Sequence, residues 1–447
     1  MRRIKKIGIP VFLCLLLSQH LSAQVVDTSK TTALTWDLQT CLDYAIKNNI
    51  QINTFSLDKQ LSAQDLLLAK AAPLPNLTGS SSQSLTHSKN FNPSSGNYES
   101  QLNFASNYSL NSSVTLYNGG YLRNNIKQRN LLVNSADLTV QQAMNDITIQ
   151  VTQSYLNILL AKENIIYIND LVATSQAQVE QAQKKYNAGA IARKDLLQLQ
   201  GQLADDKYQL VVAHSAYRQN VVTLKQILQL QVDSFYVVAP DTLIATALTP
   251  TLKEAQAVAL QVRPEIKNAE LEKQISQLDL AKARAGYKPV IMGSGLLSTS
   301  YSDNTSSGYL PQLDNFFFQR VGITLSIPIF SNRINRTNVE KAKIGIQQSE
   351  INQKNTKTTL MLAIEQAYIN VVNAQSQYYA AVEELKATQE SYRIAIEQLK
   401  IGAISITELL LQKDLYVKSL QAYIQSKYSA VMSVKIYDFY TGVPMKL

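Results

Sequence analysis

The longest pattern in the sequence is a row of apolar residues that recurs every seven positions after Gly120. Its members are Met144, Val151, Ile158, Ile165, Val172, Val179 and Tyr186. A seven-residue repeat sustained over this length predicts an α-helix that packs against neighbouring helices with a left-handed supercoil. The helix would run for about 67 residues to Asn187, which is about 100 Å at 1.5 Å per residue.

A glycine and a second helical pattern follow this helix. Gly189 opens the run Gly189-Ala190-Ile191, and apolar residues at helical spacing then continue to about Leu230. Glycine adopts positive φ without a Cβ clash, so it suits the residue just past a helix end. We therefore expect a long helical hairpin over about residues 120–230, with Gly189 at its tip.

A β-hairpin is predicted before the long helix, over about residues 77–117. Its first strand covers 79–87, and residues 88–100, with a proline and a glycine, are expected to form a loop. Polar residues alternate with the apolar positions of the second strand, which are Tyr108, Leu110, Val114 and Leu116. That period of two predicts a strand with one apolar and one polar face. Before it, residues 36–72 have a helical pattern that the prolines at 73 and 75 end.

The whole series then occurs a second time. Gly402-Ala403-Ile404 lies 213 positions after the first tip, and Pro289 lies 214 positions after Pro75. The heptad stripe returns at the same offset as Ile364, Val371, Tyr378, Leu385, Tyr392 and Leu399. This internal duplication predicts a first repeat over 24–250 and a second repeat over 251–447. Before the repeats, the basic residues at 2, 3, 5 and 6, the apolar run 7–17 and the small-residue site Leu21-Ser22-Ala23 predict a signal peptide over 1–23.

The second repeat is expected to contain the same elements as the first. A helix is predicted over 251–286 and a β-hairpin over about 290–330, with a polar loop at 302–314. A long helical hairpin over about 333–436 and a short tail follow. Each repeat thus supplies one strand pair, which gives four strands per protomer. Four strands cannot close a barrel, and an open four-stranded sheet would leave its apolar face and its edges exposed. Several copies must contribute to one sheet, and either a dimer or a trimer would satisfy the count.

Composition adds to this picture. Charged residues make up only 17% of the chain, and the remaining polar residues are mostly Asn, Gln, Ser and Thr, which suits helices with one face on water. Removal of residues 1–23 takes four cations, so the formal charge falls from +9 to about +5. So small an excess does not indicate a nucleic-acid partner. After that removal Cys41 is the single cysteine and is expected to be a packing residue.

No catalytic pattern stands out. His87 and His214 lie far apart in the sequence, and we find no HExxH, CxxC, GxSxG or P-loop spacing. We therefore predict no enzyme activity, no cofactor and no metal site. Ser405-Ile406-Thr407-Glu408 fits a capping box at the start of the helix that returns from the second tip.

The order and spacing of these motifs resemble the TolC family of outer-membrane efflux channels. The resemblance rests on Pro73-Leu74-Pro75-Asn76-Leu77, on Leu116-Tyr117-Asn118-Gly119-Gly120 and on the two tips. It implies a homotrimer: a trimeric α-barrel continued by a 12-stranded β-barrel in the outer membrane, in contact with its lipid. It also implies a passive exit duct with a large periplasmic portion, an inner-membrane transporter as partner, and a periplasmic adaptor docked at the tips.

The resemblance also suggests a pore constriction. In some family members acidic residues six and nine positions after the tip glycine face the pore. Here the sixth positions are Asp195 and Glu408, whereas the ninth are Gln198 and Leu411. Glu408 is thus a candidate both for capping a helix and for narrowing the pore, and the two roles are compatible.

One alternative function stays open from the sequence alone. A secreted periplasmic coiled-coil scaffold or adaptor would also carry long helices. The alternating strand Val321, Ile323, Leu325, Ile327 and Ile329 favours the membrane duct, because a soluble adaptor has little need of such a face. The exported cargo, whether drug, metal or protein, is not encoded in any pattern that we recognise.

Overall fold

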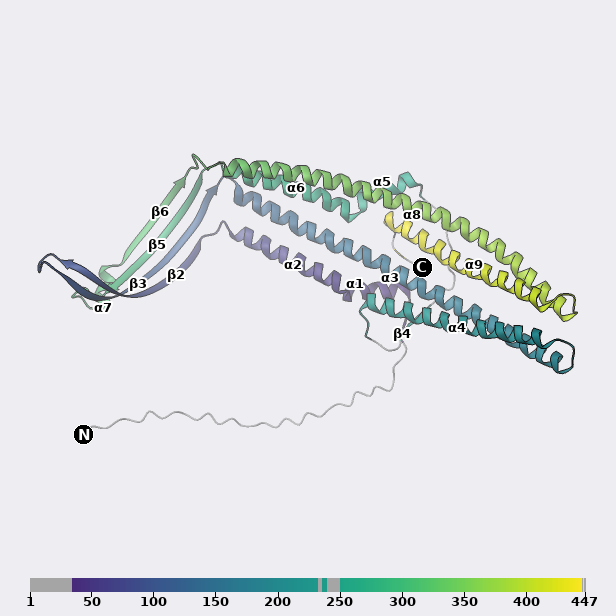
Figure 1. Ribbon diagram of the computed structural model, residues 1–447. Coiled ribbons are helices and arrows are strands. Elements are labelled where there is room, and N and C mark those ends of the chain that lie inside the picture. The colour runs from purple at the N-terminus through teal and green to yellow at the C-terminus, as the bar shows by residue number, and fades with distance from the viewer. Residues whose placement is uncertain (1–33, 232–234, 239–249, 444, 446–447) are drawn as a thin grey trace, which may run out of the picture.

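A computed structural model describes residues 34–231, 235–238, 250–443 and 445. Figure 1 shows an elongated molecule, with a curved sheet at one end and two helical tips at the other. The predicted signal peptide and part of the predicted connector before residue 250 lie outside the described residues. The expected fold class, long helical hairpins joined to four long strands per chain, is confirmed.

The described elements include, once in each repeat, a broken helical segment, two long strands and a long helical hairpin. The helices are α1 Leu38–Asn48, α2 Ile50–Ala71, α3 Tyr121–Asn187, α4 Arg193–Leu228, α5 Leu252–Val262, α6 Pro264–Ala285, α7 Tyr309–Asn315, α8 Ile334–Lys400 and α9 Ile406–Tyr440. The strands are β1 Leu34–Trp36, β2 Asn76–Asn92, β3 Asn97–Asn118, β4 Phe235–Val237, β5 Val290–Ser302 and β6 Phe318–Ser326. The two longest helices, α3 and α8, each have 67 residues.

The two β-hairpins join into one antiparallel sheet in the order β2-β3-β5-β6. Strands β2 and β3 pair from Asn76 opposite Ser113 to Asn92 opposite Asn97, so the turn covers only residues 93–96. The loop predicted over 88–100 is therefore wrong at both ends. Cross-strand backbone hydrogen bonds extend the strands through polar residues whose own β-propensity is weak, and this pairing outweighs local sequence preference.

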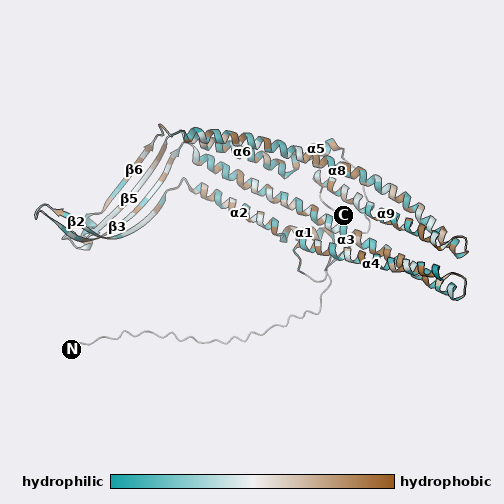
Figure 2. Cartoon of the chain, in the orientation of Figure 1, coloured by the Kyte–Doolittle hydropathy of each residue, from teal (hydrophilic) through white to brown (hydrophobic). Residues whose placement is uncertain are grey.

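The sheet has two chemically different faces. Following the register, one side carries Leu77, Val321 and Ile323, which are 73%, 91% and 74% exposed, and we call this side the apolar sheet face. The other side, the polar sheet face, carries hydroxyls such as those of Ser80 and Ser109, which lie 2.7 Å apart. Figure 2 shows the alternation of hydrophobic and hydrophilic residues along these strands.

The helices next to the sheet continue its order. Helix α2 packs on α3, α3 on α6, and α6 on α8, so the layer α2-α3-α6-α8 extends β2-β3-β5-β6 away from the sheet. Beyond this layer, α3 pairs with α4 and α8 with α9 to form the two long hairpins. None of the described helices contains an apolar stretch long enough to cross a bilayer.

Each of the two shorter helical segments is broken once, where the sequence pattern predicts one continuous helix. The first break lies at Asn49, whose Oδ1 accepts hydrogen bonds from the backbone N–H groups of Gln51, at 2.9 Å, and Ile52, at 3.3 Å. The second lies 214 positions later at Arg263, which precedes Pro264 at the first position of α6. An Asn that caps the next helix, and a proline that excludes helical conformation before it, account for the two breaks.

A short helix occupies part of the loop predicted over 302–314. Helix α7 packs on β5, and its Gln312 side chain is only 1% exposed. The Gln312 amide accepts from the Ser302 backbone N–H at 2.9 Å and donates to the carbonyls of Ser302 at 3.0 Å and Ser307 at 2.6 Å. This side chain satisfies the backbone at the end of β5, which pairs with β3 but extends past the end of β6, an arrangement that no periodic pattern could reveal.

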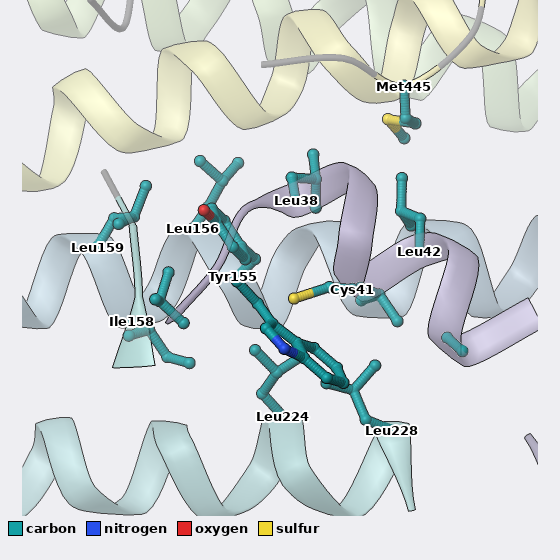
Figure 3. Close-up of a cluster of buried hydrophobic side chains, with 14 of the residues drawn as sticks. Leu38, Cys41, Leu42, Tyr155, Leu156, Ile158, Leu159, Leu224, Leu228 and Met445 are labelled. Carbon is teal, nitrogen blue, oxygen red and sulfur yellow. The ribbon is translucent and has the colours of Figure 1, made fainter. Parts of the chain in front are cut away.

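The main hydrophobic core lies about half-way along the helices, where α1 packs between α3 and α4 (Figure 3). Cys41, Val151, Leu224 and Leu228 are fully buried there, so Cys41 is the packing residue that the sequence predicts. The Tyr155 hydroxyl donates to the Val238 carbonyl just after β4. Strands β1 and β4 form a small parallel pair beside this core, which the sequence did not predict.

Candidate functional site

The two helical tips lie next to each other at the end of the molecule farthest from the sheet (Figure 1). Both chain reversals use the same backbone motif. Gly189 has φ of 72° and donates to the Tyr186 carbonyl at 2.9 Å, and Ala190 donates to the Lys185 carbonyl at 2.8 Å. This pair of bonds is a Schellman motif, which satisfies the last carbonyls of α3.

The second tip repeats the motif at α8. Gly402 has φ of 76° and donates to the Leu399 carbonyl at 3.2 Å, while Ala403 donates to the Gln398 carbonyl at 2.9 Å. A Cβ added at either glycine would meet no atom within 4 Å. Backbone conformation alone therefore requires glycine at these two positions.

The returning helices begin differently at the two tips. Ser405 caps α9, because its Oγ accepts from the Glu408 backbone N–H at 3.2 Å. Ala192 stands at the equivalent position of α4 and offers no side-chain cap. Half of the predicted capping box is therefore present. The Glu408 carboxylate does not turn back to the cap; it accepts from Gln412 Nε2 at 3.0 Å, one turn further along α9.

The two tips pack on each other through a small apolar cluster. Ile406 of α9 joins Ala182 of α3 and Leu196 and Leu199 of α4. Beside this cluster lies a groove of about 430 Å³ between the tips, which we call the inter-tip groove. Its walls include residues from both tips, among them Ala190, Ile191, Gly402 and Ile404, together with Lys185, Lys400 and Asp195.

The structure separates the two carboxylates that the sequence put forward for a constriction. Asp195 lies at the third position of α4, is half-buried and lines the inter-tip groove. Glu408 is exposed and is not among the residues that line it. Each acidic residue stands in the first turn of its helix, where the helix dipole favours a negative charge.

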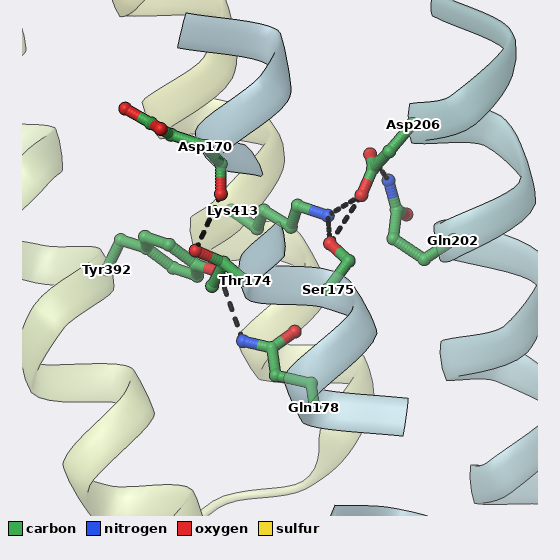
Figure 4. A network of polar contacts seen from close by, with 8 residues as sticks. All are labelled: Asp170, Thr174, Ser175, Gln178, Gln202, Asp206, Tyr392 and Lys413. Atoms are coloured by element: carbon green, nitrogen blue, oxygen red, sulfur yellow. Dashed lines mark hydrogen bonds and ion pairs between the residues drawn. The ribbon is translucent and has the colours of Figure 1, made fainter. Parts of the chain in front are cut away.

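A buried ionic network behind the tips joins the two hairpins (Figure 4). Lys413 of α9 reaches across to α4, where its Nζ lies 2.5 Å from Asp206 Oδ2. The two side chains are 1% and 3% exposed. Ser175 of α3 accepts from Lys413 at 2.7 Å and donates to Asp206 at 2.5 Å, and Gln202 donates to the other Asp206 oxygen at 2.9 Å.

All atoms of this network that carry charge have partners. Burial lowers the pKa of Lys413 from its ordinary value, and the Asp206 carboxylate opposes this shift. A buried charge left alone would cost several kcal/mol, so the pair is stable only when both partners are present. The network therefore fixes how the α8–α9 hairpin sits on the α3–α4 hairpin.

The duplication explains where this network arose. The Ser175–Asp206 contact between α3 and α4 corresponds, 213 positions later, to Thr388 and Ser419, whose hydroxyl oxygens lie 2.5 Å apart between α8 and α9. Both hairpins thus have a polar layer at the same level, and only the first contains a carboxylate. Lys413 supplies the matching cation from the other repeat.

Sequence reasoning missed Lys413 and Asp206, although a signal was present. Leu196, Leu199 and Leu203 lead to Asp206 at helical spacing, and all four residues are buried. On α9, Lys413 follows the buried Leu409 by one turn. A charged residue at an apolar position of each helix marks a buried pair, but the pattern does not identify the partner, which is 207 positions away.

Comparison with known proteins provides the context for this arrangement. The chain matches the family described as outer membrane efflux protein over residues 41–229 and 257–435, which fall one in each repeat. The cation efflux system protein CusC of Escherichia coli strain K12 is 28% identical over 162 residues. That match spans 33% of this chain and 32% of the relative.

Solved structures share the fold over nearly the whole chain. A crystal structure of CusC has a TM-score of 0.79 at 21% identity and covers 91% of this chain and 92% of its own. The CmeC outer membrane channel of Campylobacter jejuni has a TM-score of 0.76 at 20% identity, and the match covers 98% of this chain and 94% of CmeC.

Within the described ranges, no three His, Cys, Asp or Glu side chains are grouped so as to hold a metal ion.

Proposed function

The chain belongs to the outer membrane efflux protein family, and we propose that it is the exit duct of a tripartite efflux or type I secretion system. It is a protein of the cell outer membrane. In this proposal the duct is passive: it provides a water-filled path across the periplasm and the outer membrane, and an inner-membrane transporter supplies the energy.

One observation carries the proposal. The sheet has an exposed apolar face and an opposite polar face, and each of its four strands leads directly into one helix of the layer α2-α3-α6-α8. A sheet that is apolar on one side and hydroxyl-rich on the other suits lipid outside and water inside. Because strand order and helix order agree, the same two sides continue from the sheet into the helices.

Self-assembly is the second part of the proposal. Strands β2 and β6 are the two edges of the sheet, and an unpaired edge exposes backbone donors and acceptors that are costly in lipid. Pairing β6 of one copy with β2 of the next would satisfy both edges. Three copies would give the homotrimer with a 12-stranded barrel that the TolC family resemblance implies.

The adaptor is proposed to dock at the tips. The inter-tip groove offers an apolar wall from Ile191 and Ile404, and the side chains of Lys185 and Lys400 stand beside it. Exposed Ile401, at 81%, extends the apolar surface outwards. A helical hairpin of a periplasmic adaptor protein could bury these side chains, and this would hold the duct in line with the inner-membrane transporter.

Conductance in a planar lipid bilayer tests the proposal. Purified protein extracted from outer membranes in detergent should migrate as a trimer and, once inserted, produce discrete ion-conducting steps. Ile191→Asp and Ile404→Asp should leave conductance unchanged and abolish adaptor cross-linking in cells, whereas the exposed Lys207→Gln should change neither. Recovery of the protein in the soluble periplasm, or insertion without conductance, would refute the duct.

A further inference from the structure

A group of exposed cations lies where the helices meet the sheet. Five of them lie in the last turn of α2 or α6 or in the first two turns of α3 or α8: Lys70, Arg123, Lys127, Arg284 and Arg336. None of the five forms an ion pair or a side-chain hydrogen bond within the described part of the chain. We call this set the basic collar.

The collar contrasts with the exposed surface of the second helical hairpin. There most cations have an acidic neighbour three or four residues away, as in Lys386–Glu383 at 2.7 Å, Arg393–Glu390 at 2.7 Å and Lys418–Asp414 at 2.9 Å. Those charges cancel locally. Four of the five collar cations have no acidic residue three or four positions away; the fifth, Arg336, has Glu340 four positions on and helps to lower the pKa of that carboxyl.

The duplication places the collar in both repeats. Lys70 and Arg284 lie 214 positions apart, the same offset as the prolines at 75 and 289 that end their helices. Arg123 and Arg336 lie 213 positions apart and stand in the first turn of the two longest helices. A cation is therefore present at both levels in each repeat, which would repeat around an assembly of several copies.

A hollow of about 640 Å³ lies where α2 and α3 meet the sheet, and it shows which side of the helix layer bears the cations. Ser113 and Thr115 of the polar sheet face line it, together with Asn125 and Arg129 of α3. Successive helical residues are 100° apart, so a residue two positions earlier lies about 200° away. Arg123 and Lys127 thus point to the side opposite the hollow, which continues the apolar sheet face.

Helix α2 gives the same result. Leu68, Ala69, Ala71 and Ala72 all line the hollow, and Lys70, in the middle of this run, does not. Lys70 therefore faces away from the polar side as Arg123 and Lys127 do. The repeat match puts Arg284 and Arg336 at the equivalent places of the second repeat.

We propose that the basic collar binds the anionic headgroups of phospholipids in the leaflet on the helix side of the membrane. This rests on the proposed function, in which the apolar sheet face contacts lipid. Exposed aromatic rings lie at the same level: Tyr121, Tyr287 and Phe330 are 42%, 51% and 85% exposed. Aromatic and basic side chains together are typical of a membrane–water interface.

The collar would set the depth of the sheet in the bilayer. A basic residue close to an anionic surface gains about fivefold in binding. A headgroup that contacts one or two collar cations should therefore be preferred about fivefold or more over a zwitterionic one. The preference should weaken in high salt, since these cations are exposed to solvent.

The test measures lipid preference at the protein surface. Full-length protein is reconstituted in phosphatidylcholine vesicles with trace spin-labelled phosphatidylglycerol or phosphatidylcholine, and the immobilised fraction of each is compared by electron paramagnetic resonance. The wild-type protein should prefer phosphatidylglycerol about fivefold or more at low salt. The variant with all five collar cations changed to Gln should lose this preference, and Arg123→Gln with Arg336→Gln should lose part of it.

The matched control removes five cations from the first helical hairpin, by Lys184→Gln, Lys185→Gln, Arg193→Gln and Lys194→Gln at its tip and Lys207→Gln further along α4, and should keep the preference. Equal binding of the two lipids by wild-type protein that conducts ions would overturn the collar and leave the duct intact. An unchanged lipid preference in the collar variant would also overturn the proposal. So would a wild-type preference that disappears when inorganic phosphate is added at constant ionic strength. So would a changed ion selectivity with unchanged lipid preference, which would place the cations in the lumen. Failure of the wild-type protein to insert would defeat the duct and the collar together.

Discussion

Lys413 and Asp206 form a fully buried ion pair between the two helical hairpins, with Nζ and Oδ2 2.5 Å apart. The residues belong to different repeats and are 207 positions apart in the chain. No contact of this kind follows from the duplication alone, because the equivalent layer of the second hairpin holds two hydroxyls. The two repeats therefore differ in sequence at this layer, and the difference creates a contact between them.

Removing only one member of this pair should be costly. Lys413→Met leaves the Asp206 carboxylate buried without its cation, and we expect a loss of about 3–5 kcal/mol in the free energy of unfolding. Lys413→Met combined with Asp206→Leu should recover most of that loss, because neither charge then remains. Urea denaturation of the detergent-solubilised protein measures all three values.

The exposed pair Lys418–Asp414 on the same helix is the matched control. Its side chains are 69% and 59% exposed, so Lys418→Met should cost at most about 1 kcal/mol. A loss for Lys413→Met no larger than for Lys418→Met would show that the buried pair does not hold the hairpins together.

Cys41 should be unreactive in the folded protein. Burial, aided by the nearby Asp37 carboxylate, raises the pKa of its thiol from 9.0 to about 12. The thiolate is the reactive form, so alkylation at pH 8 should be slow in native protein and fast in denaturant. Mass spectrometry of the mature chain, in which Cys41 is the single cysteine, counts the modified fraction.

The same shift has a consequence for stability at high pH. Between pH 9 and 12 the folded chain keeps the thiol proton that the unfolded chain releases, so stability falls as pH rises through this range. The slope from one such group is about 1.4 kcal/mol per pH unit. Cys41→Ala should remove that part of the slope, and an identical pH dependence in the variant would contradict the assignment.

The tip glycines should each tolerate alanine poorly. At φ of 72° and 76°, Gly189→Ala and Gly402→Ala should cost about 1–2 kcal/mol apiece, although no neighbouring atom obstructs the new Cβ. Gly201→Ala is the control, since Gly201 lies inside α4, in its third turn, without a positive φ and with equally open surroundings. That change should stabilise the protein by about 0.5–1 kcal/mol, and the opposite order of effects would exclude a backbone cause.

The two tips should differ in mobility. The start of α9 is capped by Ser405 and the start of α4 has no side-chain cap, so backbone amides of the first tip should exchange with solvent faster. Ser405→Ala should speed amide exchange at the second tip, because the lost N-cap stabilises the start of α9 by about 1 kcal/mol. Ala192→Ser should slow exchange at the first tip by adding such a cap to α4. Hydrogen exchange and spin labels on both loops measure this, and equal mobility at the two tips would count against it.

Glu408 stays a candidate for the pore constriction. Its carboxylate is exposed and accepts one hydrogen bond from Gln412, so it is free to act on passing ions. Glu408→Gln should reduce the cation preference of the conductance, whereas Asp195→Asn, in the inter-tip groove, should have a smaller effect. If Glu408→Gln leaves cation preference and blocker sensitivity as they were, the constriction lies elsewhere.

Periodicity identified most of the long elements because it is a local property. The seven-residue stripe, the alternation of strand β3 and the glycines at 189 and 402 all report on residues within one or two turns of each other. The recurrence of the series 213 positions later established the duplication, and the four strands per chain followed from it.

Local patterns failed where a distant partner supplies the stabilising contact. Strands β2 and β3 extend past the predicted loop because each is the other's hydrogen-bonding partner, and α7 forms where Gln312 satisfies the backbone of β5 and the loop. Asn49 and Arg263 interrupt helices whose apolar pattern continues across the break.

The sequence by itself determined that this chain is duplicated, that its helices end in glycine tips, and that its strands have one apolar face. Only the tertiary structure decided which residues meet between the hairpins. Lys413 and Asp206 each read as a single charged residue on an amphipathic helix, and the Coulomb attraction that stabilises them arises only after the two repeats pack and exclude water from both side chains.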